Sequence, residues 1–202
     1  MDIMRFGFTT YRWAILLSIV LLSGCATSYV DGSTKEISPS QFNKPEPLHP
    51  VQALFEFQSD GTANDAATNF LKAQVIEQIK LSGLFSEVSE EPAQGGALLS
   101  ITLNNIAVTD EAYSKGFVTG LTFGLAGSQV TDGYICTASY VHDTSSAPIE
   151  KRARHAIHTT LGNSSAPSNA TKAENVEQAV TLMTRQVVSN VLNDLSYDPA
   201  FK

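Results

Sequence analysis

The sequence has few cysteines, few basic residues and no apolar run long enough to cross a membrane. Two cysteines in 202 residues exclude a framework of several disulfides. Lys and Arg number 13 against 20 Asp and Glu. This acidic balance argues against nucleic acid or anionic lipid headgroups as partners, since both need a basic patch. The clearest apolar run, 13–22, has half of the roughly 20 residues that a spanning helix needs.

The amino terminus is organised as a secretory signal. Two arginines precede the apolar run and two small residues follow it, as at a cleavage site. The segment Leu22-Ser23-Gly24-Cys25 resembles the lipobox of bacterial lipoproteins. This resemblance implies that residues 1–24 are a signal peptide. It also implies that Cys25 becomes the first residue and carries acyl chains on its sulfur and its amine.

The resemblance extends to the compartment and to the role of the cysteines. Several acyl chains together would hold the protein on a membrane almost permanently. In lipoproteins of this kind an Asp after the Cys favours the inner membrane. Ala26 and Thr27 stand here instead and imply the outer membrane, with the protein facing the periplasm. With Cys25 lipidated, Cys136 has no partner in the chain, and we interpret it as a buried small hydrophobic residue.

Residues 26–50 are predicted to be a flexible tether. They are largely polar and carry four prolines. Such a composition buries too little apolar surface to fold, and the prolines keep the chain extended. We therefore expect the lipidated Cys and a tether at 25–50, which lifts a single periplasmic domain, 51–202, off the membrane.

Residues 51–202 predict an α/β (α+β) domain. Alternating apolar residues, clearest at Leu99, Ile101 and Leu103, predict strands, and four-residue spacing of apolar residues predicts helices. The expected strands are 51–58, 86–89, 97–108, 134–142 and 149–161. The expected helices are 66–82 and a second one opened by a capping box of Thr171 and Glu174. We predict a mixed sheet of about five strands with both helices on one face, in the order β-α-β-β-insert-β-β-α.

The apolar insert at 116–131 is the most unusual internal stretch. It has no charged residue, and three of its glycines fall four residues apart. Three interpretations are open: a loop that completes the core, a contact with a partner or a second subunit, or insertion into a membrane. The residues predicted to make a partner or membrane contact are Phe117, Gly120, Leu121, Phe123, Gly124 and Leu125.

A second resemblance rests on the end of the first helix. Gly83-Leu84-Phe85, followed by Val88, resembles a periplasmic α/β module. This module occurs in the amino-terminal domain of TolB, the curli-secretion lipoprotein and the Pel polysaccharide-export lipoprotein. The likeness covers the order of elements from 51 to 195. In those families the module forms rings or docks onto other envelope proteins, and no catalytic residue carries over.

No residue pattern points to catalysis. His155 and His158 lie three apart in a predicted strand, so they should face opposite sides and not share a metal. No serine lies in a G-x-S-x-G elbow. We therefore expect no enzyme and no catalytic, metal or cofactor site.

The predicted function is a non-enzymatic binding or assembly accessory in envelope biogenesis or export. The alternatives are a self-associating structural envelope lipoprotein and a cell-wall or glycan hydrolase. The expected partners are the membrane, through the lipid on Cys25, and either an envelope protein or further copies of the chain. No nucleic-acid partner is expected.

Overall fold

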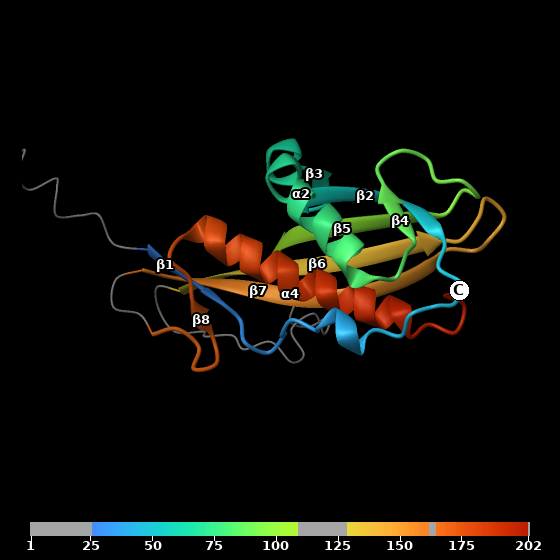
Figure 1. Cartoon of the computed structure of the whole chain (residues 1–202). Coiled ribbons are helices and arrows are strands. Elements are labelled where there is room, and N and C mark those ends of the chain that lie inside the picture. The colour runs from blue at the N-terminus through green and yellow to red at the C-terminus, as the bar shows by residue number, and fades with distance from the viewer. Residues whose placement is uncertain (1–25, 109–128, 162–164, 202) are drawn as a thin grey trace, which may run out of the picture.

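The computed structural model describes residues 26–108, 129–161 and 165–201, and these form a mixed eight-stranded sheet with two α-helices (Figure 1). The strands run β3-β2-β5-β6-β7-β1-β8 across the sheet, and β4 also pairs with β2. The elements are β1 Ala26–Val30, a 3-10 turn Pro39–Gln41, β2 Pro50–Ser59, β3 Thr62–Ala63, α2 Asp65–Ser82, β4 Glu87–Ser89, β5 Leu98–Ala107, β6 Gln129–Val141, β7 Ile149–Leu161, β8 Thr171–Lys172 and α4 Val176–Ser196. The predicted α+β class is confirmed. The strand number exceeds the predicted five because β1, β3 and β8 are short and carry weak alternation.

The long strands are paired in one continuous ladder. β2 and β5 are parallel, whereas β5, β6, β7 and β1 follow one another as antiparallel neighbours. The parallel pair requires a crossover, and α2 with β4 supplies it. The ladder places the start of β6, the end of β7 and the start of β1 at one end of the sheet.

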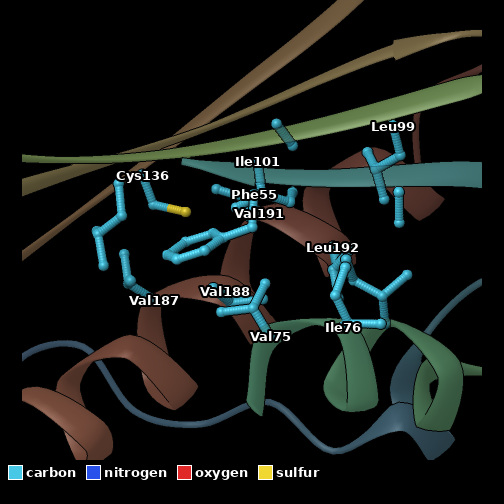
Figure 2. Close-up of a cluster of buried hydrophobic side chains, with 14 of the residues drawn as sticks. Phe55, Val75, Ile76, Leu99, Ile101, Cys136, Val187, Val188, Val191 and Leu192 are labelled. Atoms are coloured by element: carbon cyan, nitrogen blue, oxygen red, sulfur yellow. The ribbon is translucent and has the colours of Figure 1, made fainter. Parts of the chain in front are cut away.

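Both helices pack on one face of the sheet and bury its apolar residues. Side chains of β2, β5 and β6, among them Phe55, Ile101 and Cys136, point toward the helices (Figure 2). Valines and leucines of α4 and α2 meet them from the other side, and the side chains of Val191 and Leu192 have no exposed surface. The predicted packing of both helices on one face is confirmed. Removing one such side chain would cost about 2–5 kcal/mol, because a cavity remains.

α2 begins one residue before the predicted start and ends where the sequence predicts. The side chain of Asn64 accepts a hydrogen bond from the Ala67 N–H at 3.0 Å, which satisfies a donor that the first turn leaves unpaired. Gly83 follows the helix with φ 67°, in the left-handed region that a residue without Cβ adopts readily.

The predicted start of α4 is wrong by several residues. Thr171 does not cap a helix, because it pairs with Val30 in β8. The N-cap is Asn175, whose side chain accepts from the Gln178 N–H at 2.8 Å. The sequence has a capping-box pattern, but its first residue, Thr171, belongs to β8, four residues before the actual N-cap.

The prediction of a flexible tether at 26–50 is also wrong. β1 pairs along its length with the last residues of β7, and Val30 is 1% exposed. Residues after β1 then follow α4, where the Ile37 N–H donates to Ser189 Oγ and Asn190 Nδ2 donates to the Lys35 carbonyl. Phe42 is buried in the same core. The prolines do not prevent this segment from folding, because contacts with residues far away in the sequence stabilise it.

β6 is longer than predicted. It begins at Gln129, so the last three residues of the predicted insert at 116–131 belong to a strand. Thr131 pairs with His158 and Asp132 with Ile157, which extends the ladder past the predicted start at Tyr134. Residues 109–128, with the rest of the insert, lie outside the described residues.

Candidate functional site

The end of the sheet where β1 starts, here called the β1 end, is defined by Ala26, Val130 and Leu161. Ala26 pairs with Leu161, and Gln129 pairs with Thr160 on the neighbouring strand. Strands lie about 4.8 Å apart, so the first residues of β1 and β6 are separated by about 10 Å. The predicted lipidation site, Cys25, lies outside the described residues, but it is bonded directly to Ala26.

The described residues on either side of the gap at 109–128 lie in the same half of the sheet. β5 ends at Ala107, which pairs with Asp132, and β6 starts at Gln129. The six residues predicted to make a partner or membrane contact, from Phe117 to Leu125, lie outside the described residues. The structure thus brings the attachment points of two predicted functional segments together, although about 100 residues separate them in the sequence.

Exposed apolar side chains gather at the β1 end. Val130 is 55% exposed and Leu161 is 46% exposed. Val130 pairs with Thr159, so it is a diagonal neighbour of Leu161 across β6 and β7. α4 also begins at this end (Figure 1), and its first residue, Val176, is 62% exposed. The sequence places Val130 in the predicted insert and Val176 in the apolar stripe of the second helix, but their proximity to Leu161 depends on strand register and on where α4 begins.

A buried polar network holds the inner end of β1. The side chains of Asp31 and His158 are fully buried, and His158 Nε2 lies 3.0 Å from Asp31 Oδ2. His158 Nδ1 lies 3.0 Å from Thr131 Oγ1 on β6. The Ser33 N–H also donates to Asp31 Oδ1 at 2.8 Å. One imidazole therefore connects β6, β7 and the residue that follows β1.

This network has the order of groups found in a hydrolase triad, hydroxyl, imidazole and carboxylate. A catalytic imidazole must lie within hydrogen-bond reach of a bound substrate. The His158 side chain has 0% exposure, and both of its ring nitrogens already face side-chain oxygens. We therefore assign the network to holding β1 in place.

His155 faces the opposite side of β7, as its spacing from His158 predicts. Its Nε2 lies 2.8 Å from Gln186 Oε1 on α4, and the Ala156 N–H donates to its Nδ1 at 2.8 Å. Both ring nitrogens are thereby satisfied in the neutral form. Desolvation by burial lowers the pKa of His155 from its ordinary value of 6.5, despite hydrogen bonds that act in the opposite direction.

The other candidate groups also have structural surroundings. Cys136 is fully buried, as predicted, and burial raises the pKa of its thiol, so it is a poor nucleophile. His142 lies at the opposite end of the sheet, with its ring 5.1 Å from that of His49. Within 26–108, 129–161 and 165–201, no group of three or more His, Cys, Asp or Glu could hold a metal ion.

Neither described helix combines the length and the apolar character needed to cross a bilayer. α2 and α4 instead use their apolar stripes to cover the sheet.

Comparison with known proteins gives matches only among solved structures. No protein-family model and no curated protein matches the chain. The chain is similar to a PelC dodecamer from Paraburkholderia phytofirmans (12% identity, TM-score 0.34, covering 84% of this chain and 96% of that one). It is also similar to rare lipoprotein B from Shewanella oneidensis (12%, 0.39, 73% and 94%) and to a minor lipoprotein from Acinetobacter baumannii (10%, 0.36, 75% and 90%).

Two of these neighbours are described as lipoproteins. At these identities and TM-scores the likeness says nothing about what this chain binds or does.

Proposed function

We propose that this chain is a lipid-anchored protein of the bacterial outer membrane that faces the periplasm and acts by binding. Cys25 carries the acyl chains, and residues 1–24 are removed as a signal peptide. The chain serves envelope biogenesis or export as an accessory, without catalysing a reaction. The apolar insert, with the residues predicted for contact, recognises a partner or the membrane.

The observation that carries the proposal is the position of Ala26. It starts a strand of the folded domain and follows directly on the cysteine of the lipobox-like segment. If Cys25 is acylated, the lipid is therefore joined directly to the first residue of a folded strand. The apolar insert leaves the sheet on the same half, so a lipid anchor would hold it near the bilayer.

The proposal is tested first at the anchor. Replacing Cys25→Ala in the full chain should move the protein from the membrane fraction to the soluble periplasmic fraction. Mass spectrometry of the native protein should find acyl chains on the residue at position 25. Cys136→Ala is the matched control, because its thiol is buried and it should leave the protein on the membrane. A native protein without added lipid would refute the proposal.

The role of the insert is tested separately. Gly120→Leu with Gly124→Leu should abolish cross-linking of the protein to its envelope partner, since both changes add bulk to the glycine positions. Thr119→Leu adds similar bulk beside them and should preserve cross-linking. Unchanged recovery in the glycine double variant would remove the insert from the proposed contact.

Light scattering separates an accessory from a self-associating component. A protein without the signal and the lipid, residues 26–202, should scatter as a monomer if its partner is another envelope protein. A closed oligomer would favour the structural alternative, in which further copies of the chain are the partner.

A further inference from the structure

We propose that the β1 end of the sheet rests on the bilayer that holds the acyl chains, with Val130, Leu161 and Val176 in contact with lipid. The proposal deepens the proposed function and rests on the lipidation of Cys25. It commits to one occupant of this apolar surface, the membrane itself.

Almost no chain separates the predicted lipid attachment point from the fold. Consecutive Cα atoms lie 3.8 Å apart, so Ala26 can lie only one such step from the acylated residue. Ala26 and Thr27 are already paired with Leu161 and Thr160. The domain therefore has no spacer, and the strand ends beside Ala26 lie within a few ångströms of the lipid attachment point.

β1 is held firmly in the sheet. Its inner end is held by the buried Asp31–His158 pair and by the core residue Val30. Beyond it, Arg185 Nε on α4 lies 2.8 Å from Glu36 Oε2, and the Asn43 N–H donates to Ser196 Oγ. β1 therefore cannot separate from the sheet without breaking buried contacts. The direction of β1 then sets how the domain is oriented relative to the membrane.

The surface at the β1 end is apolar. Val130 of β6, Leu161 of β7 and Val176 of α4 are the exposed aliphatic residues there. The charged residues that flank the start of α4 are Lys172, Glu174 and Glu177, which do not form a basic cluster. Attraction to anionic headgroups needs such a cluster. The contact is therefore apolar, and a zwitterionic bilayer should suffice.

The experiment uses single tryptophans and lipid-borne quenchers. The only tryptophan, Trp13, lies in the predicted signal peptide, so the mature chain has none. Leu161→Trp, Val130→Trp and Val176→Trp each place one reporter at the β1 end. Tyr197→Trp is the matched control, because Tyr197 is 61% exposed and lies just after α4, at the other end of that helix. Each lipidated protein, beginning at Cys25, is reconstituted into phosphatidylcholine vesicles with or without brominated acyl chains.

Quenching by the brominated lipid should be about threefold stronger at the three β1-end positions than at Tyr197→Trp, since interfacial side chains lie ~5–10 Å into the headgroup and acyl boundary. It should persist at high salt and without anionic lipid. Equal quenching at both ends, or loss of the difference in salt, would overturn the proposal. Val176→Trp changes only an exposed first residue of a helix, so it keeps the test valid where a strand variant fails to fold.

The outcomes separate the two proposals. If mass spectrometry finds no acyl chain on the native protein, the lipid anchor fails and this inference fails with it. If the lipid is present but the β1-end reporters are no more quenched than Tyr197→Trp, only the orientation is refuted.

Discussion

The two ends of the sheet are built from different chemistry. At the far end, defined by Phe85, Tyr140 and Phe201, three aromatic rings pack with centroids 5.0–5.9 Å apart and are buried. At the β1 end three aliphatic side chains are exposed, and a buried hydrogen-bonded network around Asp31 and His158 holds the inner end of the same strand. The far end also exposes Leu48 and Leu81, so exposed aliphatic residues alone do not distinguish the two ends. What distinguishes the β1 end is that its exposed aliphatic residues lie beside a predicted lipid site, where they suit contact with a bilayer. Substitutions at the two ends can test this division.

The largest expected effect is at the far end. Tyr140 is 1% exposed and contacts the rings of Phe85 and Phe201. Tyr140→Ala should lower the free energy of unfolding by about 3–5 kcal/mol, as other aromatic truncations in cores do. Urea unfolding of residues 26–202 measures this loss. Phe70→Ala, at a residue 52% exposed, should cost under about 1 kcal/mol. Equal losses would contradict the assignment of the far end to stability.

A smaller loss is expected from the network at the β1 end. Asp31→Ala leaves the fully buried His158 without its carboxylate and should cost about 3 kcal/mol, since breaking a buried pair strands its partner. Amide hydrogen exchange should show β1 opening before the other strands. Asp31→Asn keeps an acceptor oxygen and should lose less. If the β1 amides stay as protected in Asp31→Ala as in the wild type, the network does not hold β1.

Acid should weaken the contact between β7 and α4 through His155. Its folded pKa is lowered by burial, so the unfolded chain binds more protons near pH 6. The stability that His155 contributes is fully present above its unfolded pKa of 6.5 and is lost as the pH falls toward the folded pKa. Urea midpoints at pH 7.5 and pH 5 measure the change.

His155→Gln provides the control for that pH dependence. This variant should be less stable at neutral pH, because it disturbs the bond to Gln186, but it should lose part of the decline between pH 7.5 and pH 5. A decline identical to that of the wild type would assign the pH dependence to other groups.

The smallest effect concerns the start of α4. Asn175→Ala removes the acceptor for the Gln178 N–H and should cost about 1 kcal/mol, as for other N-caps. Thr171→Ala changes an exposed residue of a two-residue strand and should cost under about 0.5 kcal/mol. Thermal unfolding of the pair measures the difference. A larger loss at Thr171 would restore the capping box that the sequence predicted.

Elements with a strong local signal were predicted well. The alternation of Leu99, Ile101 and Leu103 and the bounds of β7 agree with the structure. α2 was predicted because its cap, its apolar spacing and its terminal glycine are all local. The starts of β6 and α4 were misplaced because partners distant in the sequence decide where those elements begin.

Sequence patterns predict the lipid attachment residue and the contact residues of the insert, but not the β1 end. Cys25 and the contact residues of the insert come from patterns within short segments. Asp31, Val130 and Leu161 carry no comparable signal, since a single acidic residue and two aliphatic ones are ordinary anywhere. Strand register brings these residues together, because it pairs Ala26 with Leu161 and Tyr29 with His158.

The sequence by itself determined which segments bury one face, where α2 starts and stops, and which cysteine is predicted to carry lipid, because each depends on residues close together in the chain. Only the tertiary structure decided that residues 26–43 belong to the domain. That segment is too polar to fold alone. The end of β7, the Asp31–His158 pair and the hydroxyls of α4 satisfy its backbone and bury Val30 and Phe42. A protein expected to hang from a tether is instead folded up to the residue beside its predicted anchor.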